Sequence, residues 1–174
     1  MKRRVVSVWV AIATVFFVLV GSQTAQAAVV GTVDYLLDAS NHWVTSTAVT
    51  PDGRYVFVTN YTNGSVSRFD TSTHAVTNVS VGSHPYGVAI SPDGTTAAVA
   101  CFGSNAIVYV NVATMNNTSI GAGGSGPMGV AYSHDGTKLY VVDETSDELR
   151  ELSATGHNTI NTVQITGSGW QASA

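Results

Sequence analysis

Residues Thr50–Asn60 read Thr-Pro-Asp-Gly-Arg-Tyr-Val-Phe-Val-Thr-Asn, a turn followed at once by β-branched and aromatic residues. Proline presets φ at the second position of a type I turn, and Asp-Gly adds a side-chain acceptor and a residue that tolerates positive φ. The residues after the turn are types enriched in strands. This stretch therefore predicts a tight turn that opens into a β-strand.

The same turn, Ser/Thr-x-Asp-Gly, occurs three times, and each copy precedes an apolar run. The turn aspartates lie 41 and 42 residues apart; they are Asp52, Asp93 and Asp135. A second motif keeps this period, because Gly82–Ala89 (GSHPYGVA) returns as Gly124–Ala131 (GSGPMGVA). A period in the low forties that holds about four short strands is typical of a propeller blade.

We therefore expect an all-β fold: a β-propeller of four-stranded antiparallel blades, with about three blades present. Only 10% of the residues are charged, and no long helical periodicity appears. Alternation and turn residues divide each repeat into four strands. The predicted strands are 44–49, 54–59, 65–69 and 75–81, then 86–90, 96–101, 106–110 and 117–120, then 128–132, 138–142, 148–152 and 159–165.

These strands divide the chain into a leader, a lead-in strand and successive blades. The predicted units are 1–27, 28–43, 44–84, 85–126, 127–168 and 169–174, the last being the start of a further blade. The inner strands should include Val88–Ile90 and Val130–Tyr132, and Gly87 should let neighbouring backbones approach closely. One valine should occupy the same core position in each blade: Val58, Val99 and Val141.

At these residues the chain resembles the YVTN-type β-propeller repeat family. The matching pieces are Ser91–Gly94, Phe57–Asn60, Tyr140–Asp143, Val66–Thr71 and Val81–Ala89. The resemblance covers about 44–165 and implies an extracellular or cell-surface propeller; similar propellers occur in lactonase-like enzymes and in redox-protein subunits. It implies no single activity.

The number of repeats is smaller than a closed ring needs. Beyond the leader the chain has room for about three and a half repeats, whereas propellers usually close with roughly four to eight blades. We therefore expect a fragment or truncated member, or a protomer that self-associates to complete the ring. Val29–Leu37 would then be the outer strand of the closing blade.

Charge and cysteine content exclude several classes of partner. Without Lys2, Arg3 and Arg4 the chain keeps 4 basic residues against 11 acidic ones. Nucleic acids and anionic lipids both require clustered cations, so neither is an expected partner. The single cysteine, Cys101, is interpreted as a buried strand residue, because no neighbour in sequence would activate a thiol.

Two sets of titratable residues are candidates for a metal-binding or catalytic site. Asp143, Glu144, Asp147, Glu148 and Glu151 fall within nine residues and could supply oxygens to Ca²⁺. Their spacing matches no EF-hand, and a solvated loop is the simpler interpretation. The five histidines, at 42, 74, 84, 134 and 157, are scattered and are interpreted as loop or turn residues. We therefore predict no catalytic residue, no metal ligand and no cofactor.

Four Asn-x-Ser/Thr sequences, beginning at Asn60, Asn63, Asn78 and Asn116, match glycosylation acceptors and have meaning only if the host glycosylates exported proteins. Two function classes remain open. The favoured hypothesis is an exported, non-catalytic binding or cell-surface structural module whose partner is a protein or a cell-envelope glycan. The alternative is an exported enzyme of lactonase or lyase type with an axial site. The inner strands, such as Tyr86–Val88, carry few titratable groups, which favours binding.

We predict that the chain is exported, to the periplasm, the cell surface or the medium, and cleaved after Ala27. Lys2–Arg4 are followed by the apolar run Val5–Val20, and Ala25-Gln26-Ala27 has the small-x-small form of a cleavage site. The run is short for a span of roughly 20 residues. Intact-mass measurement of exported protein should therefore show a species that begins at Ala28. A mature species that keeps Val5–Val20 would instead identify a membrane anchor.

Overall fold

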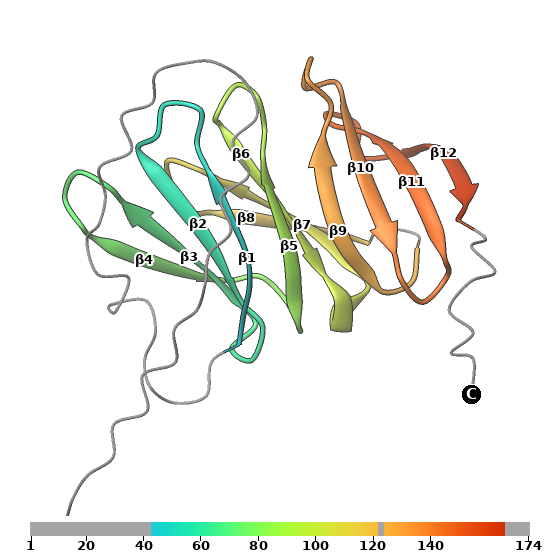
Figure 1. Ribbon diagram of the computed structural model, residues 1–174, viewed down its shortest axis with the longest axis horizontal. Helices are drawn as coiled ribbons and strands as arrows, with labels where there is room; N and C mark the ends of the chain where they lie inside the picture. The colour runs from blue at the N-terminus through green and yellow to red at the C-terminus, as the bar shows by residue number, and fades with distance from the viewer. Residues whose placement is uncertain (1–42, 122–123, 166–174) are drawn as a thin grey trace, which may run out of the picture. The chain divides into compact units, whose positions relative to one another are not determined.

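The computed structural model describes residues 43–121 and 124–165. Within them, twelve strands form three separate antiparallel sheets of four strands each (Figure 1). The expected all-β class and the four-stranded blades are therefore confirmed. The expectations for the leader, for Val29–Leu37 and for residues 169–174 fall on residues outside those described.

Each sheet is a meander whose strands pair in the order of the sequence. The strands are β1 (Val44–Val49), β2 (Tyr55–Asn60), β3 (Ser65–Asp70) and β4 (Val76–Ser80) in blade 1; β5 (Pro85–Ile90), β6 (Thr96–Cys101), β7 (Ala106–Asn111) and β8 (Asn117–Gly121) in blade 2; and β9 (Pro127–Tyr132), β10 (Lys138–Asp143), β11 (Glu148–Ser153) and β12 (Thr159–Gln164) in blade 3. Every predicted end lies within one residue of the observed one. In the described part of the chain, no helix is both long and apolar enough to span a membrane.

The turn between the first two strands is built alike in all three blades. In blade 2 the Ser91 hydroxyl donates to Asp93 Oδ1 at 2.6 Å and accepts the Thr96 N–H at 3.0 Å, while the Thr95 N–H donates to the same carboxylate at 3.0 Å. Thr50 with Asp52, and Ser133 with Asp135, make the same contacts. The glycine that follows has φ of 71–73° in every copy, which favours glycine.

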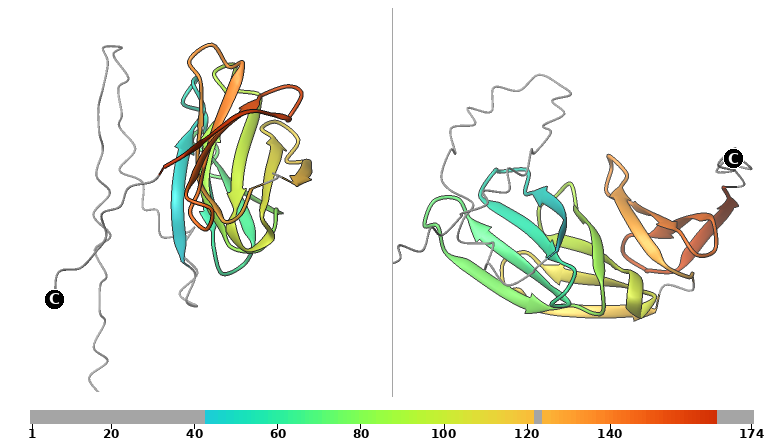
Figure 2. Two further views of the ribbon diagram at one scale, coloured as in Figure 1. Left: turned by 90° about the vertical axis from the view of Figure 1, so that its right-hand side faces the viewer. Right: turned by 60° about the horizontal axis from the view of Figure 1, so that its bottom comes forward.

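Packing of one sheet on the next forms the core. The cluster between blades 1 and 2 includes Phe57, Val66, Val99 and Val108. The cluster between blades 2 and 3 includes Ala98, Ile107, Leu139 and Val141. Between neighbouring sheets the first strands approach most closely: β5 lies against β1 on one side and against β9 on the other (Figures 1 and 2). A Cβ on Gly87 would lie 2.4 Å from the Met128 carbonyl oxygen, so the backbone needs glycine there.

The three equivalent valines lie where the repeat places them. Val58 pairs with Thr47, Val99 with Val88 and Val141 with Val130, so each is the fourth residue of a second strand. Their side chains are at most 5% exposed. The prediction that they are equivalent core positions is therefore confirmed.

Strand β6 lies between two other sheets and is buried on both faces. Ala97, Val99 and Cys101 belong to the cluster shared with blade 1, and Ala98 and Ala100 to the cluster shared with blade 3. Small side chains suit this position because the sheets are close together here. Burial raises the pKa of Cys101 to about 12, so the thiol is an inert core group, as predicted.

A buried ion pair lies on the face of blade 3 that packs on blade 2. The Arg150 Nη2 donates to Asp143 Oδ1 at 2.9 Å, and its Nε donates to Oδ2. Both side chains are at most 2% exposed. The equivalent positions of blade 2 hold Cys101 and Val108, so the blade itself does not require charge there. Asp143 is therefore a buried strand residue, which corrects its interpretation as part of a solvated loop.

We predict that the chain loses stability as the pH falls from about 4 towards 2. Hydrogen bonds from a Ser or Thr hydroxyl, then from a backbone N–H, lower the pKa of three turn carboxyls, that of Asp135 to about 2; the three are Asp52, Asp93 and Asp135. Unfolded aspartates titrate near 3.9. The stabilisation is thus complete above the unfolded pKa and is lost as the pH falls through the folded pKa. Thermal melts followed by circular dichroism across this range measure it.

The control for this prediction is a variant with all three turn aspartates replaced by asparagine. Its melting temperature should depend less on pH over the same interval, because asparagine keeps an acceptor oxygen but does not titrate. Equal acid sensitivity in the variant and the wild type would show that other carboxylates are responsible.

We predict that Arg150→Val destabilises the chain by about 3–5 kcal/mol, because it leaves Asp143 buried without its cation. The double variant Asp143→Cys, Arg150→Val copies blade 2 and should recover most of that loss. Urea unfolding of the three proteins tests this expectation. A double variant no more stable than Arg150→Val would show that blade 3 depends on the charges themselves.

Candidate functional site

Two positions in each blade lie together at the start of its first strand. The residue just before the first strand accepts a hydrogen bond from the residue just after the second strand. The pairs are Tyr61 N–H to Trp43 O at 2.8 Å, Phe102 N–H to His84 O at 3.0 Å, and Glu144 N–H to Gly126 O at 2.9 Å. The repeat therefore places two residues side by side at one end of every inner strand.

In blades 1 and 2 these positions hold the rings of Trp43, Tyr61, His84 and Phe102. Together with Tyr86, the second residue of β5, they form one continuous aromatic cluster. Tyr61 is its centre: its ring lies 5.9 Å from Trp43, stacks on His84 at 4.4 Å, and meets Tyr86 edge-on at 5.7 Å. Tyr86 extends the contact to Phe102 at 6.5 Å. These separations suit attractive ring pairs.

The cluster faces solvent while its rings hold one another in place. Trp43 is 65% exposed, and His84 is exposed as well. His84 has φ of 52°, a left-handed conformation that is uncommon for a residue with a side chain. The equivalent residue of blade 3 is Gly126, with φ of 69°. Blade 2 therefore carries an imidazole at a position where the backbone conformation favours glycine.

Threonine hydroxyls anchor the backbone beneath the cluster. The Thr45 hydroxyl lies 2.9 Å, and the Thr59 hydroxyl 3.0 Å, from the carbonyl oxygen of Tyr86. Thr59 is fully buried and also accepts the Ser46 N–H at 2.9 Å, where a register shift interrupts the pairing of β1 with β2. Bulges of this kind re-aim neighbouring side chains. These bonds fix Tyr86 of blade 2 relative to blade 1.

Blade 3 shows that the rings are not required to build a blade. At the same two positions it has Gly126 and Glu144, yet its backbone hydrogen bond differs by only about 0.1 Å from those of the other blades. The aromatic side chains thus add a surface property to blades 1 and 2 without being needed for the local fold. His84 is one of the five scattered histidines of the sequence, and its ring partners were not predicted. The signal available in the sequence was the 41-residue spacing of Trp43 with His84 and of Tyr61 with Phe102.

The acidic residues of 143–151 do not converge on one point. Glu151 pairs with Lys138 at 2.7 Å, and Glu148 accepts the Gln164 amide at 2.7 Å. Asp147 is a turn residue with φ of 53°, as Asn105 and Gly64 are in the other blades. Within residues 43–121 and 124–165, no three His, Cys, Asp or Glu side chains are placed to hold a metal ion.

The remaining candidate residues have mainly local roles. His74, His84, His134 and His157 lie in turns or loops, as predicted. Asn60, which begins one acceptor sequence, is buried and donates to Ser67 at 2.8 Å, so that sequence is not accessible for glycosylation. Asn78 and Asn116 are both exposed, and Asn78 accepts the Ser67 hydroxyl at 2.6 Å.

Solved structures with the same fold include a hydrazine synthase of Kuenenia stuttgartiensis, with 24% identity and a TM-score of 0.67 over 71% of this chain and 36% of that one. Two others are a structure of U3-55K and the WD40 repeats of RRP9, each with 17% identity and a TM-score of 0.64 over 71% of this chain and 39% of theirs. The chain thus spans less than two fifths of these structures. At such identities they show the fold alone.

No curated protein sequence matches the chain. A family model does: residues 18–171 match the family described as "Lactonase, 7-bladed beta-propeller". This match includes all the described strands, and it agrees with the three four-stranded blades. The chain therefore belongs to the seven-bladed lactonase β-propeller family.

Proposed function

We propose that this chain is an exported, non-catalytic binding module that docks a protein partner on the aromatic cluster. The observation that carries the proposal is the comparison between blades: blades 1 and 2 place rings at positions where blade 3 builds the same backbone with Gly126 and Glu144. Aromatic side chains that are exposed or half-buried, and that the local backbone does not need, are the kind of group that supplies binding energy in interfaces.

The cluster has the physical properties of an interface anchor. Stacking of Tyr61 on His84, and its contacts with Trp43 and Tyr86, restrict the rings before any partner arrives. Less side-chain entropy is then lost on association. Tyr61 and Tyr86 also bring hydroxyl groups that can hydrogen-bond at the edge of an apolar contact. A partner with an apolar segment flanked by polar backbone would fit this surface.

The face of blade 3 that points away from blade 2 is not covered by another described sheet. On the face of blade 3 away from blade 2, Val142 pairs with Leu149, and Leu149 with Val163. The equivalent face of blade 2, which includes Ala100 and Ile107, is buried by blade 3. We propose that another blade of the same type covers Val142 and Val163, which are 41% and 52% exposed here. That blade would belong to the same ring in a longer chain or to a second copy of this chain.

We also assign the repeats to the YVTN type, on the basis of their motifs.

Lactone hydrolysis is the second candidate, and the family assignment favours it. Ester hydrolysis needs a nucleophile or an activated water and a group that receives its proton. His84 is a titratable side chain at the end of an inner strand, where it stacks on Tyr61. An axial site would combine it with residues supplied by other blades.

We predict that Trp43→Ala and Tyr61→Ala each weaken partner binding at least about tenfold, since truncation of an anchor residue typically costs 2 kcal/mol or more. The matched control is Ile160→Ala, because Ile160 is 53% exposed but lies on β12 of blade 3. Immobilised chain would capture proteins from an envelope extract of its host, and the affinity of each purified candidate would then be measured by calorimetry.

Three results would count against this proposal. Equal affinity of the wild type and both cluster variants would remove the cluster from the interface. If the immobilised chain retains envelope glycans and no protein, and the cluster variants lose this retention, the partner is a glycan. Hydrolysis of γ- or δ-lactones by the wild type, abolished by His84→Ala, would establish the enzymatic alternative.

A further inference from the structure

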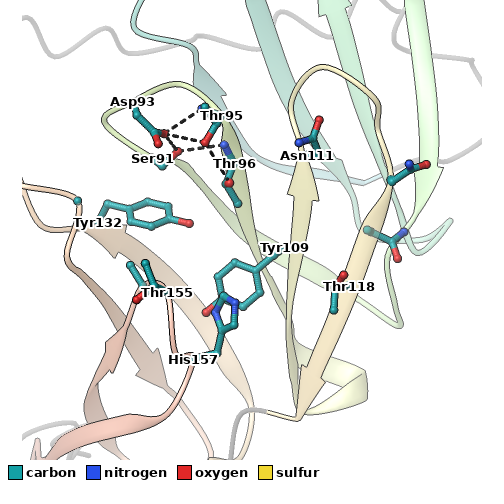
Figure 3. Close-up of a pocket in the computed structure, with 14 residues that line it drawn as sticks. Ser91, Asp93, Thr95, Thr96, Tyr109, Asn111, Thr118, Tyr132, Thr155 and His157 are labelled. Carbon is teal, nitrogen blue, oxygen red and sulfur yellow. Dashed lines mark hydrogen bonds between the residues drawn. The ribbon is translucent and has the colours of Figure 1, made fainter.

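A cleft separates blades 2 and 3 (Figure 3). It lies beside the β5–β6 turn, at the opposite end of the inner strands from the aromatic cluster. Its volume is about 540 Å³, within the range of small-molecule sites of roughly 300–1,000 Å³. Blade 2 contributes Tyr109 on β7, Thr118 on β8 and the turn that contains Asp93. Blade 3 contributes Tyr132 on β9 and His157 from the β11–β12 turn.

Two buried polar atoms in this cleft have no hydrogen-bond partner among residues 43–121 and 124–165. They are the hydroxyl oxygen of Tyr109 and Nδ1 of His157. Tyr109 is only 7% exposed, and its ring centroid lies 4.1 Å from that of His157. A buried polar group without a partner costs free energy, so both atoms are available to pair with a ligand or with an ordered water. Figure 3 shows the two side chains together at the wall of the cleft.

The junction between blades 1 and 2 shows how the same space is closed elsewhere. One repeat earlier, Tyr109 corresponds to Arg68 and His157 to Met115, judged by strand register and by the left-handed turn residue. Arg68 donates to the carbonyl oxygens of Val112 and Ala113 at 2.5 and 2.8 Å. Met115 is 6% exposed and belongs to the core.

At the junction between blades 2 and 3, the residues equivalent to Val112 and Ala113 are Ala154 and Thr155, which line the cleft. Tyr109 ends in a hydroxyl, whereas Arg68 ends in a guanidinium with several donors. Between blades 2 and 3 the chain therefore leaves open the space that Arg68 and Met115 fill between blades 1 and 2.

The chemistry of the lining is neutral and hydrogen-bonding. Its side chains are mainly hydroxyl and amide groups, and no Lys or Arg is among them. The one carboxylate, Asp93, already accepts the Ser91 hydroxyl and both the N–H and the hydroxyl of Thr95. Phosphate and carboxylate ligands are normally held by cations, so the absence of Lys and Arg argues against an anionic ligand. A neutral ligand with several hydroxyl groups matches this lining.

We propose that the cleft between blades 2 and 3 binds a neutral saccharide, either a free sugar or the end of a glycan, whose hydroxyl groups pair with the Tyr109 hydroxyl and His157 Nδ1. Thr118 and Thr155 provide further hydroxyl contacts. Burial raises the pKa of Tyr109 to about 12, so this hydroxyl keeps its proton and can donate. This site is separate from the aromatic cluster, and either proposal can fail without the other.

The first test is a titration of the ¹⁵N-labelled chain with neutral monosaccharides (glucose, galactose, mannose and N-acetylglucosamine) and with oligosaccharides that end in each of them. We expect saturable amide shifts at Thr96, Thr118, Thr155 and His157. Binding of oligosaccharides with no response to the free sugars identifies a glycan end as the ligand. No saturable shift with any of these sugars up to tens of millimolar overturns the proposal.

The second test compares variants. Tyr109→Phe removes only a hydroxyl that has no partner among the residues that the structure describes. We therefore expect an unchanged or higher melting temperature and roughly three- to tenfold weaker sugar binding, the factor of one hydrogen bond. Tyr140→Phe is the matched control, because Tyr140 lies on the opposite face of blade 3. The double variant Tyr109→Arg, His157→Met copies the closed junction and should abolish binding. A lower melting temperature of Tyr109→Phe with unchanged sugar affinity would show that the hydroxyl serves the fold.

Discussion

A four-stranded blade has no core of its own, and the structure depends on burying both faces of each sheet against neighbouring sheets. Strand β6 shows the consequence most clearly, since Ala97 to Cys101 are all fully buried and alternate between the two neighbours. Apolar side chains on both faces, small where the sheets are close, follow from this constraint. The same constraint explains why Val142 and Val163, on a face with no described neighbour, belong to a packing surface.

The repeat supplies an internal comparison for every position, and this comparison separates structural residues from functional candidates. The Ser/Thr-x-Asp-Gly turn is kept in all three blades with nearly identical hydrogen bonds, so it serves the fold. The buried pair of Asp143 and Arg150 is replaced by Cys101 and Val108 in blade 2, so it is a local solution to packing. Surface residues that differ between equivalent positions of the blades are therefore the candidates for function.

Two such differences stand at opposite ends of the inner strands. At one end, rings occupy positions that blade 3 fills with Gly126 and Glu144. At the other end, Tyr109 replaces the arginine that closes the preceding junction, and its hydroxyl has no partner in the described part of the chain. The first surface is apolar and exposed, which suits a macromolecular partner. The second is a neutral polar cleft, which suits a small hydroxylated group. Recognition at both ends of a rigid scaffold is compatible with a chain of the lactonase propeller family.

The sequence by itself determined the all-β class, the blade period, the strands to within one residue and the core role of Val99, because turn chemistry and alternation are local patterns that the 41–42-residue spacing repeats. It did not reveal the ion pair of Arg150, the aromatic cluster or the cleft. Each of these joins residues of different strands or blades, such as Tyr61 with His84 or Tyr109 with His157. Only the tertiary structure decided them, because the distance between two side chains on adjacent sheets depends on how the sheets pack and not on their separation along the chain.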